Sequence, residues 1–294
     1  MKQCLVAILI AAAAPVAAAQ DALVSTDWVL QNAKNPKVRI VEVSVDPGLY
    51  EKGHVPGAAG FKWHSDLCDP VARDIVSREN FEKLCSRAGI ASDTTVVFYG
   101  DNSNWFACWG YWIFNLYGHK DLKIMDGGRQ KWEAEKRPMD TTAPSLAPTA
   151  YQVTAPNLDV RVRLPEVLDV VNRKLDAKLL DVRSPEEFSG KIIAPPGSAE
   201  LAVRAGHIPG AKNVPWARAA NPDGSFKSAD ELRQLYERDA GLKPKDDVIA
   251  YCRIGERSSH TWFVLSYLLG YDHVRNYDGS WTEWGNSVRT PIEK

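Results

Sequence analysis

The 294-residue sequence predicts an α/β protein of two similar domains, each a parallel-sheet core with helices on both faces. Three observations support this prediction. The chain is longer than the ~250 residues at which single hydrophobic cores stop growing. Short β-branched runs alternate with amphipathic stretches, which is typical of parallel sheets with helical crossovers. Three segments of the first half also return, in the same order, in the second half.

The repeated segments keep a nearly constant spacing of 152 or 153 residues. The pairs are GHVPGA (53–58) with GHIPGA (206–211), VVFY (96–99) with VIAY (248–251), and DGGRQKW (126–132) with DGSWTEW (278–284). This period is far too long for a solenoid, so we infer a duplicated domain.

The second half shows the β/α alternation most clearly. Buried-strand patterns occupy residues 178–182, 248–251 and 273–277. Residues 230–240 and 258–269 have the apolar spacing of helices. Ligands of such sheets bind beyond the carboxyl ends of the strands, so the segment after residue 251 is the first place to look for chemistry.

The first residues have the pattern of a signal peptide. Lys2 is followed by an apolar run at residues 5–14, then by Pro15 and small residues. A membrane-spanning helix needs ~20 apolar residues, so this run is too short for one. A buried N-terminal helix is the alternative. We expect an exported, periplasmic protein, secreted if the cell has no outer membrane.

The predicted domain boundaries follow from this pattern and from proline content. They are residues 1–19 (signal peptide), 22–137 (first domain), 138–156 (a proline-stiffened linker over the surface) and 157–294 (second, catalytic domain).

Composition narrows the classes of partner. The 36 Lys+Arg against 37 Asp+Glu give a net charge of −1, which argues against a nucleic-acid-binding surface. Spacings typical of metal ligands and of phosphate-binding loops are absent from the sequence, so we expect no metal and no cofactor. We also expect no membrane span and a monomer.

The sequence after residue 251 is that of a nucleophile loop. Cys252 comes directly after a strand, and a helix is expected to begin near Ser258. Amide N–H groups in such a loop converge on one point, which stabilises an anion and lowers a thiol pKa. Gly255 permits the turn, while Arg253 and Arg257 supply two cations.

The first copy lacks these residues. Gly100 takes the position of Cys252, and Asp101 follows it where an anion would be repelled. The other cysteines of the mature chain, Cys68, Cys85 and Cys108, belong to no motif and are expected to be structural. Whether Cys68 and Cys85 form a disulfide is left open.

Both copies resemble rhodanese domains, and the chain from about residue 23 onward resembles the tandem-domain rhodaneses, a family of thiosulfate sulfurtransferases. The match rests on DVRSPEEF (181–188), the GHIPGA repeat, the loop at 252–258 and YDGSWTEW (277–284). In that family an inactive N-terminal domain packs against an active one, whose cysteine carries sulfur as a persulfide. The resemblance implies that role for Cys252, with Ile254, Gly255, Glu256 and Ser258 in the cradling loop. It also implies a small-molecule sulfur donor and a small-molecule sulfur acceptor as partners.

Arg253 places the loop with the thiosulfate branch of the family, whereas mercaptopyruvate-type members have glycine there. Ile254 and Glu256 depart from the animal-type loop and look like the bacterial form. We expect Cys252 to attack the outer sulfur of thiosulfate while Arg253 and Arg257 bind the sulfonate oxygens.

Three other functions are weighed: transfer from 3-mercaptopyruvate, a persulfide carrier for a protein partner, and a cysteine phosphatase. The spacing here is Cys-x4-Arg, whereas a phosphatase loop has Cys-x5-Arg, which disfavours the last.

The remaining candidates have a structural alternative. Asp181 and Arg183 are expected to form a supporting ion pair. His207 is expected to fix its turn, and Arg257 to pair with Glu256 or Glu283 if it does not bind substrate. Trp281 and Trp284 are expected either to line the pocket or to fill the core.

Overall fold

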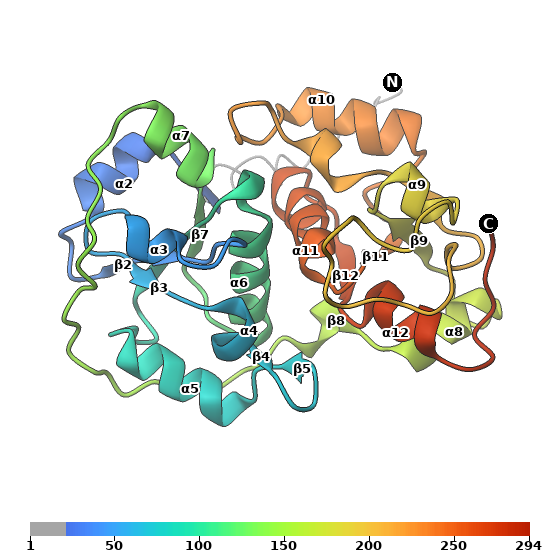
Figure 1. The fold of residues 1–294 in the computed structure, drawn as a ribbon, viewed down its shortest axis with the longest axis horizontal. Coiled ribbons are helices and arrows are strands. Elements are labelled where there is room, and N and C mark those ends of the chain that lie inside the picture. Colours follow the sequence, from blue (N-terminus) through green and yellow to red (C-terminus); the bar gives the residue numbers. More distant parts are fainter. Residues whose placement is uncertain (1–21) are drawn as a thin grey trace, which may run out of the picture.

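The computed structural model describes residues 22–294, which form two α/β halves lying side by side (Figure 1). The predicted signal peptide at residues 1–19, including Cys4, lies outside the described residues. Within residues 22–294, no helix is both long and apolar enough to cross a membrane.

The first half contains a sheet of five parallel strands. In spatial order they are β1 (Leu23–Val24), β7 (Leu122–Met125), β6 (Thr95–Tyr99), β2 (Val38–Glu42) and β3 (Ala59–Gly60). The α-helices of this half are α2 (Thr26–Asn32), α3 (Leu49–Lys52), α4 (Trp63–Asp66), α5 (Arg78–Arg87), α6 (Trp105–Leu116) and α7 (Gly128–Ala134). A short antiparallel pair, β4 (Cys68–Asp69) and β5 (Asp74–Ile75), forms a hairpin beside the sheet.

The second half repeats this topology. Its parallel strands, in spatial order, are β8 (Arg161–Val162), β12 (His273–Tyr277), β11 (Asp247–Tyr251), β9 (Lys178–Asp181) and β10 (Lys212–Asn213). Its α-helices are α8 (Leu164–Val171), α9 (Pro185–Phe188), α10 (Ala229–Arg233), α11 (Glu256–Phe263) and α12 (Ser280–Asn286). Counted along the chain, the strands of both sheets lie in the order 1-5-4-2-3, so the duplication inferred from the sequence holds in three dimensions.

Helices cover both faces of each sheet, as predicted, because successive strand residues point to opposite sides. In the first half Val97 belongs to the core under α2 and α7, while Phe98 faces α4, α5 and α6. In the second half Ile249 belongs to the core under α8 and α12, and Ala250 to the core under α10 and α11.

The predicted strands at 178–182, 248–251 and 273–277 are confirmed as β9, β11 and β12. The predicted helix at 230–240 is α10, continued by a π-helical segment at Gln234–Asp239.

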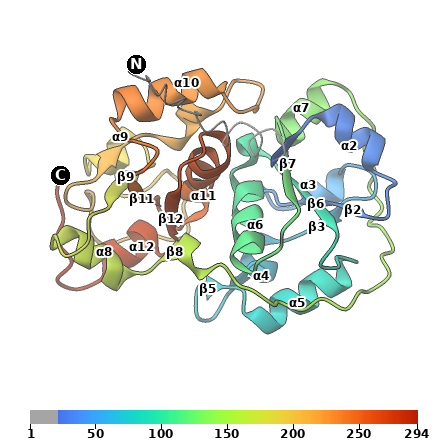
Figure 2. The ribbon, with the colours of Figure 1, turned by 180° about the vertical axis from the view of Figure 1, so that it is seen from behind.

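The two halves meet along α6 and α11, which lie side by side at the centre of the molecule (Figures 1 and 2). Tyr111 contacts Phe263 edge-on with ring centroids 5.1 Å apart, and Asn115 Nδ2 donates to the Tyr267 hydroxyl at 2.8 Å. In both pairs the partners are equivalent residues of the two copies. Contacts between equivalent positions place a local twofold axis through this interface.

The proline-rich segment at 138–156 contains no helix or strand. Most of its side chains are exposed, but Tyr151 and Val153 are buried in the core of the first half. The expectation of a surface linker is therefore incomplete, because two apolar side chains anchor it.

Candidate active site

The loop around Cys252 is shorter than predicted. β11 ends at Tyr251, and α11 begins at Glu256 rather than near Ser258. The reason is Gly255, whose φ of 101° lies in the left-handed region and which caps the helix directly. Glu256 and Arg257 thus belong to the first turn of α11, and the cradle consists of residues 252–255.

Cys252 is completely buried and is held by two backbone contacts. Its own N–H donates to the Ser280 hydroxyl at 3.0 Å, and the Gly255 N–H donates to its Sγ at 3.1 Å. Ser280 in turn donates to the Tyr277 carbonyl at 2.7 Å. An amide that already points at the sulfur is the arrangement expected of an anion cradle.

The other end of the loop is fixed by side chains. Asn276 Nδ2 donates to the Gly255 carbonyl at 3.0 Å, and the Ser258 hydroxyl lies 2.6 Å from Asn276 Oδ1. A Cβ atom at Gly255 would lie 2.8 Å from the Asp278 backbone, so only glycine fits there.

The pKa of the Cys252 thiol lies below its ordinary value. Burial raises it, but the positive charge of Arg257 and hydrogen bonds from Ser258 and the Ile254 amide lower it by more. A thiolate is the nucleophilic form of cysteine, so the site favours the reactive state. By contrast, burial raises the pKa of Cys68 to about 12 and holds the pKa values of Cys85 and Cys108 well above the ordinary value.

Arg257 has a different partner from those expected. Its Nη1 and Nη2 donate to the two carboxylate oxygens of Glu187 in α9, each at 2.9 Å, so the pairing expected with Glu256 or Glu283 is wrong. Glu187 is fully buried. Burial lowers the pKa of Arg257, but the hydrogen bonds with Glu187 and the negative charges of Cys252 and Glu187 hold that pKa above its ordinary value. The guanidinium therefore acts on Cys252 as a fixed charge.

Arg253 is the more accessible cation. It is half-buried, and its Nη1 donates to the Glu200 carbonyl at 2.7 Å. It borders a cavity of about 310 Å³ between the two halves. The second half lines this cavity with Arg253, Ile254, Glu256 and Arg257, and the first half with Val45, Asp46, Pro47, Trp63, His64, Trp105 and Phe106.

The first-half wall of this cavity is what sequence reasoning missed. Trp105 and Phe106 directly follow the first copy's degenerate loop, and the local twofold axis turns that loop toward the catalytic one. The aromatic residues after Asn104 were the available signal, but their relevance depends on the packing of α6 against α11.

Glu256 is the first residue of α11, and only 2% of its surface is exposed. Burial and the neighbouring Cys252 raise its pKa well above the ordinary value, while Arg73 of the first half, 3.6 Å away, opposes them.

The other predicted residues lie behind the loop. Asp181 and Arg183 form a fully buried ion pair, and the Arg183 guanidinium stacks 4.6 Å from the centre of the Trp281 ring. Trp281 Nε1 donates to the Arg204 carbonyl at 3.0 Å. These three residues support the strands under the loop, and none of them is among the residues that line the cavity.

His207 and Trp284 have structural contacts. His207 Nδ1 lies 2.9 Å from the Phe188 carbonyl, and its ring stacks on that of Phe188. Trp284 is fully buried in the second core, and its Nε1 donates to the Pro291 carbonyl at 2.8 Å.

Among residues 22–294, all four cysteines are free, so Cys68 and Cys85 form no disulfide. Over the same residues, no group of three or more His, Cys, Asp or Glu is arranged to hold a metal ion.

Residues 25–135 and 165–287 each match the Rhodanese-like domain family. The chain belongs to this family. Its two rhodanese-like domains correspond to the two halves, and the cradle lies in the second.

Curated relatives cover nearly the whole chain. The "Sulfur carrier protein TtuD" of Thermus thermophilus is 54% identical over 277 residues, which are 93% of this chain and 97% of that protein. A protein of Mycolicibacterium smegmatis named "Putative thiosulfate sulfurtransferase" is 53% identical over 94% of this chain and 99% of its own length. These names and the two rhodanese-like domains support sulfur transfer as the reaction class.

Solved structures agree on the fold. YnjE superposes with a TM-score of 0.80 at 26% identity, covering 93% of this chain and 68% of its own. An anaerobic ergothioneine biosynthesis enzyme from Chlorobium limicola has a TM-score of 0.79 at 24% identity, covering 93% of this chain and 70% of its own.

Proposed function

We propose that this protein is a thiosulfate sulfurtransferase that carries sulfur as a persulfide on Cys252. The observation that carries the proposal is the thiol itself. It is the one cysteine of residues 22–294 whose pKa is lowered, and it lies in a loop whose amides point at its sulfur. Such a loop stabilises the negative charge of the thiolate and of the persulfide that replaces it.

In the first half-reaction, the Cys252 thiolate attacks the outer sulfur of thiosulfate. A new S–S bond forms at Sγ, the S–S bond of thiosulfate breaks, and sulfite leaves with the bonding electron pair. Arg253, at the border of the cavity, is positioned to bind the sulfonate oxygens. Arg257, held by Glu187, supplies the fixed positive charge that stabilises the thiolate.

In the second half-reaction, a nucleophilic acceptor such as cyanide or a thiolate attacks the outer sulfur of the persulfide. The Cys252 thiolate then leaves and is stabilised again by the Gly255 N–H and Arg257. The two steps share no ternary complex, so we expect ping-pong kinetics.

The donor is tested by measuring kcat/KM for thiosulfate and 3-mercaptopyruvate side by side with cyanide as acceptor. We expect thiosulfate to be the better donor, because Arg253 suits a sulfonate. A higher kcat/KM for 3-mercaptopyruvate would overturn the choice of donor while leaving the persulfide chemistry in place. Hydrolysis of para-nitrophenyl phosphate serves as a control for the phosphatase alternative and should not occur.

A persulfide carrier for a protein partner is the second candidate, favoured by the name of the Thermus relative. It predicts that thiosulfate loads Cys252 but that free cyanide or small thiols unload it slowly. Single-turnover transfer to cyanide distinguishes the two. Unloading as fast as steady-state turnover supports the enzyme, and unloading only onto a protein thiol supports the carrier.

We also propose that the protein is exported, from the pattern of residues 1–19. N-terminal sequencing of protein isolated from periplasm should begin near residue 20, and a full-length chain found only in cytoplasm would contradict export.

A further inference from the structure

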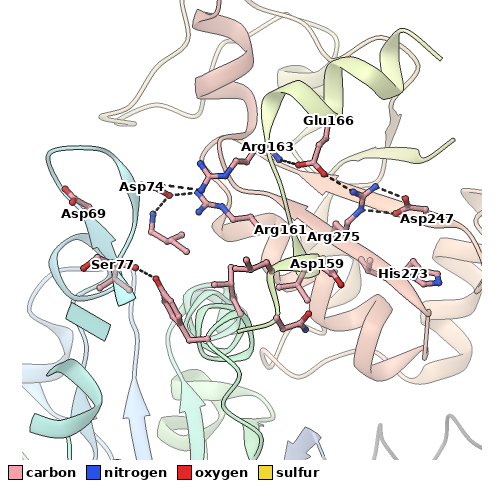
Figure 3. A pocket seen from close by; sticks show the side chains of 18 of the residues that line it. Asp69, Asp74, Ser77, Asp159, Arg161, Arg163, Glu166, Asp247, His273 and Arg275 are labelled. Atoms are coloured by element: carbon pink, nitrogen blue, oxygen red, sulfur yellow. Dashed lines mark hydrogen bonds and ion pairs between the residues drawn. The ribbon is translucent and has the colours of Figure 1, made fainter. Parts of the chain in front are cut away.

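The hairpin β4–β5 of the first half lies near two segments that position Cys252. They are the cradle at residues 252–255 and the loop at residues 278–280. Its neighbouring residues Arg73 and Asp74 contact different parts of the second half. Asp74 forms an ion pair with Arg161 (Figure 3). Arg161 also pairs with Asp278 at 2.7 Å. Asp278 in turn packs against Gly255. Asp74 of β5 thus supports the loop at 278–280 through Arg161. Arg73 lies next to Glu256, the first residue of α11.

Arg73 faces two carboxylates of the second half. Its Nε lies 2.8 Å from Glu200 Oε2, and its Nη2 lies 3.6 Å from Glu256 Oε1. The guanidinium also lies 6.0 Å from the centre of the Trp63 ring, at the wall of the small cavity.

Glu256 depends on this contact. Its Oε1 is buried and has no hydrogen-bond partner among the described residues. The charged and titratable groups that act on Glu256 come from both halves. They are Cys252 and Arg253 of the cradle and Arg73 and Cys68 of the hairpin, with Glu200 and His64 around Arg73. A buried carboxylate needs a partner charge, and the one from the facing half is Arg73.

The duplication provides an internal comparison. At the spacing of 152 residues, the counterpart of Glu256 is Asn104. The spacing falls to 151 at the end of the hairpin, where Cys68 pairs with Ile75 and Ala220 with Phe226, so the counterpart of Arg73 is Gly224. Gly224 belongs to the second half's own loop, whose Phe226 N–H donates to Asp126 of the first half at 2.9 Å. The same architecture therefore exists on both sides of the axis. The Arg–Glu pair is present only on the side that contains the cysteine.

We propose that Arg73 is a positioning residue that sets the charge of Glu256 and, through it, the ionisation of Cys252. The proposal rests on the proposed role of Cys252 as the sulfur carrier. Two buried acidic groups side by side resist losing both protons. Arg257 stabilises the negative charge on the thiol and Arg73 the negative charge on the carboxyl. The inactive domain thereby tunes the nucleophile of the active one.

The test is the pH dependence of Cys252 alkylation by iodoacetamide, followed by peptide mass spectrometry so that only this thiol is scored. It needs no sulfur donor, so its result is independent of whether thiosulfate is the substrate. Arg73→Met should raise the pKa of Glu256, because an opposite charge within ~4–6 Å shifts a carboxyl pKa by about 1–3 units. The carboxyl then keeps its proton, so the midpoint for Cys252 should move to lower pH by about one unit. Glu256→Gln should move it to lower pH, since one neighbouring anion is gone.

The double variant decides the mechanism. In the Glu256→Gln background, Arg73→Met should shift the midpoint by less than about 0.3 units. A shift to higher pH in either background would mean that Arg73 acts on Cys252 directly, and no shift in the unaltered chain would mean that it does not act at all. Either result overturns the proposal.

Two further variants guard against a folding artefact. Arg73→Lys retains the positive charge and should keep the midpoint within about 0.3 units of the original. Arg87→Met removes an exposed ion pair with Asp66 in the same half and should leave the midpoint unchanged. If Arg73→Met does not fold, Glu256→Gln alone still decides, because an unchanged midpoint in that variant contradicts the coupling.

Discussion

The two halves of the molecule share one scaffold and differ in the loop after the fourth strand. Arg129 N–H donates to the Gly100 carbonyl at 2.8 Å, just as Trp281 N–H donates to the Cys252 carbonyl at 3.0 Å. The Tyr99 and Tyr251 hydroxyls likewise accept from equivalent backbone amides, at 2.9 and 3.1 Å. The backbone frame of the site is thus retained in a copy that has no nucleophile.

The difference lies in the side chains that occupy the frame. In the first half, the Asp101 carboxyl accepts hydrogen bonds from the Val45 and Asp46 amides, at the position that Arg253 takes in the second half. In the second half, amides and Arg257 converge on Cys252 instead. The first half thus contributes to the site without a nucleophile of its own, because it supplies the facing helix, one wall of the cavity and Arg73.

The largest expected effect comes from removing the nucleophile, which the second half contains and the first half lacks. Cys252→Ser should lower sulfur transfer from thiosulfate to cyanide by at least about a thousandfold, because the nucleophile is lost. The measurement is the steady-state rate of thiocyanate formation. Cys108→Ala, which removes a buried thiol of the first half, is the matched control and should retain most of the activity. Turnover by Cys252→Ser close to that of the unaltered chain would refute the assignment.

The next prediction compares one buried ion pair from each half. Arg257→Met leaves Glu187 buried without its partner, which should lower the free energy of unfolding by about 3–5 kcal/mol. It should also raise the pKa of Cys252, seen as slower alkylation at neutral pH. Arg129→Met breaks a buried pair with Glu42 in the first half, at positions that do not correspond to Arg257 and Glu187, where the N–O distance is 2.9 Å.

Urea unfolding should show a comparable loss of stability for both arginine variants. Only Arg257→Met should change the reactivity of Cys252. Equal effects of the two variants on alkylation would mean that general loosening, rather than the charge of Arg257, explains the lowered pKa.

A third prediction asks whether the first copy can be converted. A Cβ atom at Gly100 would lie 2.2 Å from the Val43 carbonyl oxygen, so Gly100→Cys should destabilise the fold by about 1–3 kcal/mol. In the Cys252→Ser background Gly100→Cys should restore no sulfur transfer, because the neighbouring Asp101 disfavours a thiolate at this position. Restored thiocyanate formation would show that the scaffold alone suffices.

The smallest effect concerns a buried histidine. Burial lowers the pKa of His260 to about 3, whereas an exposed histidine titrates near 6.5, so folding favours its neutral form. Its contribution to stability is complete above pH 6.5 and falls by about 1.4 kcal/mol per unit as the pH drops toward 3.

The equivalent residue of the first half is Cys108, which does not titrate in this range. His260→Cys should therefore flatten the pH dependence of urea unfolding between pH 6 and 4, whatever it costs at pH 7. The same slope in the variant and the unaltered chain would contradict this account.

Local patterns in the sequence predicted much of the fold. The strands β9, β11 and β12 come from short β-branched runs, and the duplication is visible in three repeated segments. The start of α11 was placed two residues late, because the left-handed conformation of Gly255 moves the helix forward. That detail depends on the contact between Gly255 and Asp278, which are distant in sequence.

The sequence predicted only the part of the candidate site that lies in one continuous segment. Cys252 and its loop stand in one continuous motif. The Arg257 partner, Glu187, is 70 residues away, and Arg73 belongs to the other half. Both depend on how the sheet edge and the α6–α11 interface bring separate segments together, which no local pattern encodes.

The most direct test of the central claim is peptide mass spectrometry after incubation with thiosulfate. We predict the mass of one added sulfur atom on the peptide containing Cys252 and none on those containing Cys68, Cys85 or Cys108, with loss of that sulfur on adding cyanide. Transfer to cyanide that proceeds while Cys252 carries no sulfur, or while another cysteine carries it, would contradict the account.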